Sequence, residues 1–211
     1  GMFLWHARKY VREAVGIDYD IRSARYAGRK CGCRTYSKDI EETDLKPGSF
    51  DIICAFQVLE HTNNPLDFIL RHKKYLKPNG IFAIEVPNLR DSLLYVYNVP
   101  FYEKFYFHKP HLWYFSAKSL TKLMVQNNFR GKASFLHGYN FMNHMNWIFR
   151  NAPQSEGFMA RRKPILPIRD GVDTKTKNAL NSFIQATDEA YKKKLADLGI
   201  SSFLFYIGKM D

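Results

Sequence analysis

Two apolar runs near the middle of the chain enclose a segment with helical periodicity. Residues 51–56 and 81–86 are short runs rich in apolar and β-branched side chains, which is typical of strands buried on both faces. The turn signal Lys-Pro-Asn-Gly at 77–80 ends the helical segment before the second run. The apolar positions that mark the helix are Leu66, Ile69, Leu70 and Leu76. This order predicts a strand-helix-strand unit.

The same periodicities extend over the rest of the chain and predict an α/β fold. Residues 89–115, which follow the strand-helix-strand unit, are aromatic and irregular, a pattern that indicates an active-site lid. Residues 140–198 read as a helical insertion within a single domain of 211 residues. Helices are expected near 3–11, 22–29, 117–127, 141–150 and 174–198, and strands near 15–18, 34–36, 132–137 and 201–207.

Composition narrows the class of protein without naming a function. An apolar content of 45% is enough for a substantial core, and no apolar stretch reaches the ~18 residues of a membrane span. Three sparse cysteines indicate reduced thiols, and we expect a cytoplasmic protein without a membrane partner. The net charge of +12 comes from short, scattered basic groups, which favour a solvated surface over a binding groove.

Several segments of the sequence carry a family resemblance, in the expected order. DIICAFQVLEHTNNPLDFI and LKPNGIFAIEVPN resemble the fourth strand, its loop and helix, and the fifth strand of class I S-adenosylmethionine-dependent methyltransferases. VGIDYD resembles that family's second strand with its terminal acidic residue. SKDIEET resembles the loop that follows the third strand. HLWYFSAKSLTKLMVQNNF and the final SSFLFYIGK are similar to later segments of one bacterial small-molecule branch. The resemblance implies a doubly wound, Rossmann-like sheet with an antiparallel last strand.

One part of the family pattern is missing from these 211 residues. The first strand and its GxGxG loop do not occur, and the opening GMFLWHARKYV resembles the helix that follows that loop. Gly1 is either the last glycine of the loop or a remnant of an expression tag, and we favour the tag. A glycine loop lets backbone N–H groups approach a nucleotide closely. We therefore expect an N-terminally incomplete methyltransferase with impaired cofactor binding.

The resemblance assigns a set of cofactor-binding residues. Asp18 ends an apolar strand, where a carboxylate accepts hydrogen bonds from a ribose diol. Asp39 is similar to the residue that accepts the adenine amino group, and the backbone N–H of Ile40 to the group that faces a ring nitrogen. Phe56 and Gln57 leave the fourth strand where the family lines the cofactor cleft. Each carboxylate also has an ordinary alternative as a helix cap or loop residue.

Methyl transfer from a sulfonium needs alignment of the reactants, and a base when the acceptor is a neutral hydroxyl. His61 and His111 are the candidate bases, because an imidazole titrates near neutral pH. Glu60, His61 and His111 with Gln57 also resemble the metal cluster of small-RNA 2′-O-methyltransferases. Because Gln57 replaces the first carboxylate of that pattern, we assign no metal.

The sequence therefore predicts an S-adenosylmethionine-dependent methyltransferase that acts on a small-molecule acceptor such as a sugar, a lipid-linked molecule or a quinone. Two alternatives stay open. An RNA or nucleotide methyltransferase would use the aromatic and basic residues that interleave at 102–115, and a non-catalytic binding module would keep only the fold. Since the missing strand belongs at the centre of the sheet, unpaired edges predict a homodimer or aggregation.

Overall fold

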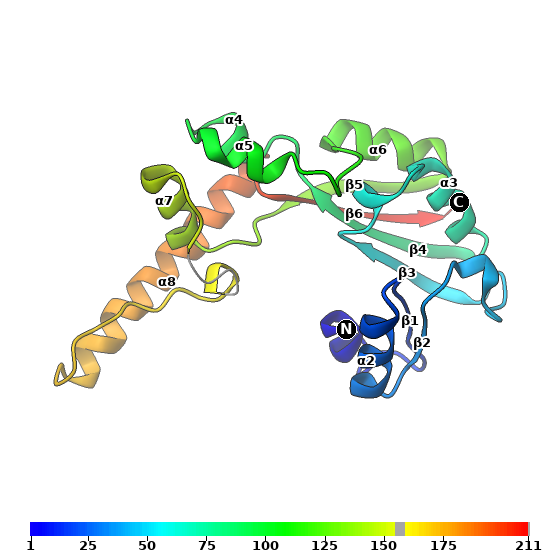
Figure 1. Cartoon of the computed structure of the whole chain (residues 1–211), viewed down its shortest axis with the longest axis horizontal. Helices are drawn as coiled ribbons and strands as arrows, with labels where there is room; N and C mark the ends of the chain where they lie inside the picture. The colour runs from blue at the N-terminus through cyan, green and yellow to red at the C-terminus, as the bar shows by residue number, and fades with distance from the viewer. Residues whose placement is uncertain (155–158, 211) are drawn as a thin grey trace.

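The computed structural model describes residues 1–154 and 159–210 and is built around a four-stranded mixed sheet. The strand order is β3-β4-β6-β5 (Figure 1). β3 and β4 are parallel, whereas β6 is antiparallel to both of its neighbours. The strands are β3 (Phe50–Phe56), β4 (Leu76–Pro87), β5 (Phe129–Leu136) and β6 (Phe203–Met210). The predicted α/β fold with an antiparallel last strand is confirmed.

A second, two-stranded parallel sheet belongs to the N-terminal part of the chain. It pairs β1 (Val15–Ile17) with β2 (Arg34–Tyr36), and α1 (Met2–Ala7) and α2 (Ile21–Cys31) accompany it. Figure 1 shows this unit, in blue, beside the β3 edge of the larger sheet. No strand of the described residues pairs with both units, so that edge of β3 has no strand partner there. Cys54, within β3, is accordingly exposed.

One face of the larger sheet is covered by α3 (Pro65–Lys73) and α6 (Ala117–Gln126) (Figure 1). The side chain of Asn64 accepts hydrogen bonds from the first turn of α3, and Ser116 forms a capping box with Ser119 at α6. The core beneath these helices contains fully buried side chains from helices and strands alike. They include Leu59, Ile69, Phe82, Ile84, Leu120, Met124, Leu204 and Tyr206.

The central helix differs from its prediction in both length and buried face. Ile69 is buried in the core as predicted, but Leu66 and Leu70 are 43% and 45% exposed, and Phe68, which was not predicted, joins Ile69 in the core. The helix ends at Lys73, and Leu76 already belongs to β4. The predicted turn at 77–80 is an irregularity inside β4, where the pairing with β3 shifts register and Asn79 has a φ of 65°. Apolar spacing alone could not distinguish the end of the helix from the start of a bulged strand.

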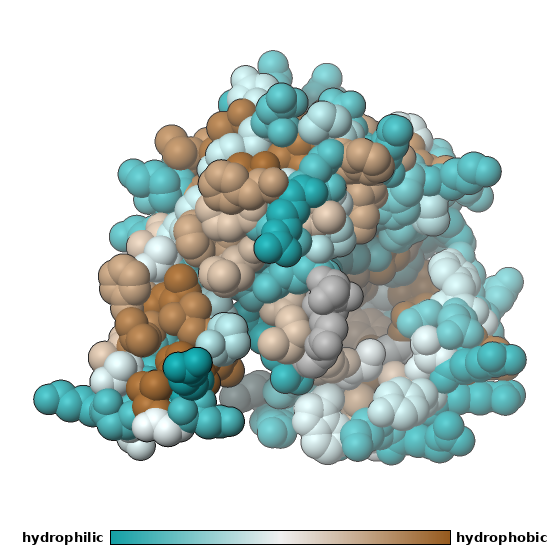
Figure 2. All heavy atoms as spheres, turned by 60° about the vertical axis from the view of Figure 1, so that its left-hand side comes forward, coloured by the Kyte–Doolittle hydropathy of each residue, from teal (hydrophilic) through white to brown (hydrophobic). Residues whose placement is uncertain are grey.

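The predicted lid contains regular structure. It includes α4 (Ser92–Tyr95) and α5 (Pro100–Tyr106), which pack with α7 (Phe141–Arg150) around Tyr102 and Trp147. Figure 2, which brings this side of the molecule forward, shows apolar side chains interspersed with charged ones on its surface. The lid is therefore a folded layer of short helices.

The long helix α8 (Thr174–Asp197) projects away from the sheet over much of its length (Figure 1). The apolar spacing of α8 predicts buried positions at Leu180, Phe183, Ile184 and Leu195, but Leu180 and Phe183 are 44% and 70% exposed, whereas Leu195 is buried at 2%. α8 contacts α7 and β5, and residues 164–166 bind Asn181 and Gln185 along it. The predicted insertion at 140–198 also contains η3 (Met159–Arg161) and residues 155–158, which lie outside the described residues.

The helices of the described residues contain none that is both long and apolar enough to cross a membrane.

Candidate active site

The backbone leaves β3 through a left-handed residue. Gln57 has a φ of 55°, which costs a non-glycine residue roughly 1–3 kcal/mol and is frequent at functional sites. Two hydrogen bonds hold it there: its backbone N–H donates to the carbonyl of Glu85 at 2.9 Å, and its side-chain Nε2 donates to Glu85 Oε1 at 3.1 Å. Burial raises the pKa of the Glu85 carboxyl, while the bond from Gln57 lowers it. The side chain of Gln57 is therefore turned toward β4.

Glu60 lies in the short 3-10 helix η2 (Leu59–His61) and is completely buried. Its backbone carbonyl accepts hydrogen bonds from the N–H groups of Leu112 and Trp113, at 2.8 and 3.1 Å, and these tie the end of the lid to the end of β3. Neither carboxylate oxygen has a hydrogen-bond partner among the described residues. Burial raises the pKa of Glu60 to about 7.

His61 is fixed by one hydrogen bond that also sets its tautomer. Its Nδ1 lies 2.8 Å from the carbonyl oxygen of Pro110. Because a carbonyl can only accept, Nδ1 carries a proton, so that in the neutral ring Nε2 is the nitrogen with the lone pair. Nε2 lies 3.7 Å from Glu60 Oε1, and the imidazole is 41% exposed. His61 thus presents a basic nitrogen to the solvent side of the Glu60 carboxylate.

His111 comes from the lid and joins the same group. Its ring centroid lies 4.8 Å from that of His61 and 3.9 Å from that of His108. Its Nδ1 is buried without a hydrogen-bond partner in the described part of the chain. Burial, together with the neighbouring His108 and His61, lowers the pKa of His111 to about 4, so its ring is neutral at pH 7. The structure therefore brings the two predicted catalytic histidines together.

The predicted nucleotide-binding residues lie on the N-terminal unit. Asp18 is exposed at the end of β1, and one of its oxygens accepts a hydrogen bond from the backbone N–H of Asp20 at 3.0 Å. Its other oxygen has no partner among the described residues. A carboxylate in this position can accept hydrogen bonds from a diol.

Asp39 has more partners than the sequence suggested. Its Oδ2 accepts from Arg71 at 2.5 Å and from the Tyr19 hydroxyl at 3.1 Å, and its Oδ1 accepts from the backbone N–H of Glu41. Burial opposes ionisation of Asp39, but these hydrogen bonds and the Arg71 charge outweigh it and lower the pKa. Ile40 begins the following 3-10 helix, η1 (Ile40–Glu42), and its side chain is buried.

Phe56 is half-buried at the carboxyl end of β3. Its ring stands edge-on to Phe3 of α1 with 4.7 Å between centroids, and lies 5.9 Å from Phe205 of β6. Phe56 therefore takes part in a contact between α1 and the larger sheet. In the described residues no hydrogen bond or ion pair joins the Asp18 and Asp39 group to the Glu60 group.

Sequence reasoning did not find Glu85, Arg71 or Tyr19. Glu85 had a usable signal, since it is the one charged residue within the apolar run 81–86. Arg71 and Tyr19 had none, because their role depends on a contact with Asp39 that only the fold creates.

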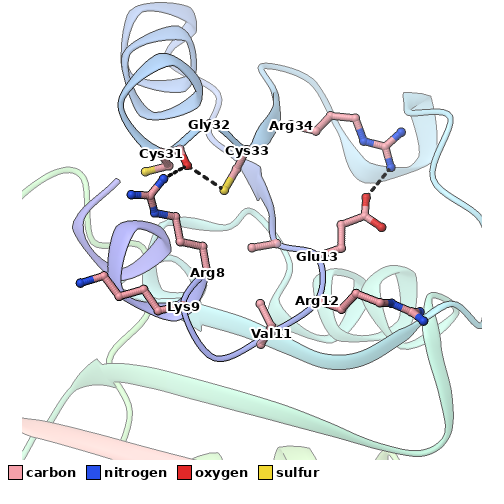
Figure 3. Close-up of a pocket in the computed structure, with 10 residues that line it drawn as sticks. Arg8, Lys9, Val11, Arg12, Glu13, Cys31, Gly32, Cys33 and Arg34 are labelled. Carbon is pink, nitrogen blue, oxygen red and sulfur yellow. Dashed lines mark hydrogen bonds and ion pairs between the residues drawn. The ribbon is translucent and has the colours of Figure 1, made fainter.

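A cavity of about 600 Å³ lies elsewhere, between α1 and the turn that joins α2 to β2 (Figure 3). Its basic side chains are partly engaged: Arg8 donates to the carbonyl of Cys31, and Arg34 pairs with Glu13 at 3.4 Å. None of the predicted site residues lines it. We therefore place the candidate active site at the ends of β1 and β3.

Comparisons with known proteins show the family to which the chain belongs. A family model described as "Methyltransferase domain" matches residues 1–133. A curated Mycolicibacterium smegmatis protein, a probable S-adenosylmethionine-dependent methyltransferase, is 30% identical over 78 residues, which are 36% of this chain and 30% of that protein. The chain thus matches less than a third of the length of this relative.

Solved structures resemble the whole fold at low sequence identity. A SAM-dependent methyltransferase from Archaeoglobus fulgidus aligns with a TM-score of 0.58 and 15% identity, over 98% of this chain and 80% of that one. The plantazolicin methyltransferase BpumL, solved in complex with a desmethylPZN analogue and SAH, aligns with a TM-score of 0.56 and 17% identity, over 100% of this chain and 73% of that one. At such identities the likeness shows the fold alone.

Proposed function

We propose that this chain, which belongs to the methyltransferase-domain family, binds S-adenosylmethionine at the ends of β1 and β3 and transfers its methyl group to a small-molecule acceptor. The observation that carries the proposal is the pair of polar groups at these strand ends. Asp18 offers an accessible carboxylate after β1, and His61 in its neutral form offers the lone pair of Nε2 after β3. Ligands of open α/β sheets bind at the carboxyl ends of the strands.

On the cofactor side, Asp18 would accept hydrogen bonds from the ribose hydroxyls. Asp39 and the backbone N–H of Ile40 would face the adenine, and Phe56 with Gln57 would line the cleft beside them. Since Asp39 already binds Arg71 and Tyr19, its share of the affinity is smaller than that of Asp18. The ribose contact is therefore the main anchor of the cofactor on this unit.

On the acceptor side, His61 would remove the proton of a neutral hydroxyl as the methyl group is transferred. The hydrogen bond from Nδ1 to Pro110 orients the ring and leaves Nε2 free to take that proton. His111 is a weaker base, because its pKa of about 4 lies far from neutral pH. We propose His61 as the catalytic base and His111 as its neighbour in the acceptor pocket.

An acceptor with an apolar or ring-shaped part fits the surroundings of this pair. Aromatic contacts lead from His111 through Tyr114 and Tyr106 to Tyr102 and Trp147, with centroid separations of 5.1–6.0 Å. They end at a groove of about 470 Å³ between α5 and α7, whose lining includes Phe101, Phe105, Trp147, Lys104 and Arg150. Tyr102, Tyr106 and Trp147 are themselves buried, so the groove would offer a quinone, a sugar ring or a lipid-linked molecule with a phosphate the exposed rings of Phe101 and Phe105 beside two basic side chains.

We also propose a cytoplasmic location, which suits three free thiols, and a homodimer. The dimer would cover the edge of β3, where Ile52 is 49% exposed and no strand of the described residues pairs. Light scattering that reports a monomer at all concentrations would exclude the dimer.

The test of cofactor binding is calorimetry with S-adenosylmethionine. Asp18→Ala should weaken binding by roughly 10- to 150-fold, the equivalent of about 1.5–3 kcal/mol for charge-assisted hydrogen bonds. Asp51→Ala is the matched control, because Asp51 is an exposed carboxylate at the other end of β3, paired with Lys77. Equal effects of the two substitutions would contradict the ribose assignment, and the absence of any binding would contradict the proposed function.

A further inference from the structure

The side chain of Glu60 is the least satisfied polar group near the candidate site. It is fully buried, and neither oxygen accepts a hydrogen bond from the described residues. Leaving a polar group buried and unpaired destabilises a fold, and leaving a carboxylate so destabilises it more. A native fold that keeps such a group usually supplies its partner from outside the polypeptide, as water, an ion or a ligand.

His61 is oriented to contact the same external partner as Glu60. Its Nδ1–H donates to the Pro110 carbonyl, which directs the lone pair of Nε2 away from the backbone. Metal-binding histidines are held in the same manner, with the second ring nitrogen donating to a carbonyl or carboxylate. Nε2 lies only 3.7 Å from Glu60 Oε1, so one ion could contact both.

His111 completes a set of three donors. One ligand atom from each of Glu60, His61 and His111 lies within 4.8 Å of the others. The ligand atoms around a tetrahedral zinc ion are about 3.3 Å apart, given bonds of about 2.0–2.1 Å. Small side-chain rotations would close the difference, and the unpartnered Nδ1 of His111 shows that no competing bond to that nitrogen would have to break.

We propose that Glu60, His61 and His111 form a binding site for a single first-row transition dication, best suited to Zn²⁺. Two imidazoles and one carboxylate favour Zn²⁺, Co²⁺ or Ni²⁺ over Mg²⁺, which prefers an all-oxygen octahedral shell. Three protein ligands leave at least one coordination position open, as in reactive rather than structural zinc sites.

The site does not depend on Gln57, whose replacement of a carboxylate led the sequence interpretation away from a metal. Its amide is bound to Glu85 and lies outside the ligand set. In the loaded protein the ion would lower the pKa of an acceptor hydroxyl, and so would promote loss of the proton that His61 removes as a base in the unloaded protein. The inference therefore goes beyond the proposed function and does not require it.

The experiment measures metal uptake directly. Protein stripped with EDTA is loaded with Zn²⁺ or Co²⁺, passed through gel filtration, and analysed for bound metal and for the visible absorption bands of Co²⁺. These measurements use a protein background with Cys31→Ser and Cys33→Ser, which removes two thiols that lie near each other as alternative metal ligands. We expect one ion per chain, and a loss of affinity of at least ~100-fold in Glu60→Gln, His61→Asn and His111→Asn.

His108→Asn is the matched control, because His108 stacks on His111 and is not part of the ligand set. It should retain one ion per chain. Circular dichroism checks each fold, and His61→Asn carries the test if Glu60→Gln unfolds, because the His61 side chain is 41% exposed.

Failure to take up a stoichiometric ion, unchanged uptake in the three ligand variants, or preference for Mg²⁺ over Zn²⁺ would overturn the inference. Calorimetry with S-adenosylmethionine on the same samples separates the two proposals. Metal uptake without cofactor binding would contradict the proposed function and support the metal site, and cofactor binding without uptake would do the reverse.

Discussion

Two carboxylates that follow strands of this protein have opposite surroundings. Asp39, after β2, receives hydrogen bonds from Arg71, Tyr19 and the backbone of Glu41. Glu60, after β3, is fully buried and its oxygens receive none from the described residues. From the sequence Asp39 is assigned to the cofactor site, whereas Glu60 is mentioned only for its resemblance to a metal cluster and receives no role. The structure reverses this emphasis, since a carboxylate with its partners in place has less left to offer a ligand.

The largest effect should come from His61, which lies beside the unsatisfied carboxylate. His61→Ala should lower methyl transfer by ~100-fold or more while leaving the dissociation constant for S-adenosylmethionine unchanged, because the imidazole acts on the acceptor side. The measurement is transfer of a tritiated methyl group to a protein-free extract of bacterial cells, with calorimetry alongside.

His111→Ala sharpens this result. Since the low pKa of His111 makes it a poor base at pH 7, its removal should lower turnover less than the removal of His61. If both single variants kept full turnover, neither histidine would be the base, and alignment alone would have to explain the reaction.

Polar side chains that are buried without hydrogen-bond partners also occur away from the candidate site. This second case tests whether such burial is by itself a sign of function. His137 and His144 are buried with their rings 4.3 Å apart, and Nε2 of each has no partner in the described residues. Burial, with His144 and Lys192, lowers the pKa of His137 to about 2, and burial lowers that of His144 to about 3. Tyr139 and Tyr191 face the same pair.

The folded protein holds both histidines neutral. Its free energy of unfolding should therefore be highest above the ordinary histidine pKa of 6.5 and should fall as the pH drops below that value. The expected loss is about 1 kcal/mol per histidine for each pH unit below that value. Urea unfolding between pH 7.5 and 5 measures it.

His137→Asn with His144→Asn should flatten this pH dependence, whereas the exposed His6→Asn should leave it unchanged. The double variant should keep its metal uptake. Loss of metal uptake with the fold intact would show that the two clusters are not independent, which would weaken the contrast drawn from Glu60.

A smaller effect is expected at the satisfied carboxylate. Asp39→Asn removes the ion pair with Arg71 and should lower the free energy of unfolding by about 1 kcal/mol, a typical value for a pair near the surface. Its effect on cofactor affinity should be clearly smaller than that of Asp18→Ala. Equal losses of affinity would show that Asp39 gives up its ion pair with Arg71 and binds the adenine instead.

Much of the fold follows from local patterns. The helix α7 and the strand β2 lie at the predicted residues, and Ser116 caps α6 as expected. The errors occur where tertiary contacts decide. Phe183 has the spacing of a buried residue but is exposed on α8, and Leu76 continues a helical pattern while its backbone has already entered β4.

The candidate site could be predicted in part. The position of His61 after a strand is visible in the sequence, and the resemblance added His111 from the lid. The state of each group is not visible, because it depends on non-local contacts. The carbonyl of Pro110 sets the tautomer of His61, and Leu112 and Trp113 bind the backbone of Glu60, so that the lid closes over its side chain.

The most direct test of the account is a crystal structure of the chain with S-adenosylhomocysteine, the demethylated cofactor. We predict that the ribose lies within hydrogen-bond distance of the Asp18 carboxylate, with the sulfur directed toward the end of β3 where Glu60 and His61 meet His111. A ligand bound instead in the basic cavity beside Arg8 and Arg34, away from both strand ends, would contradict it.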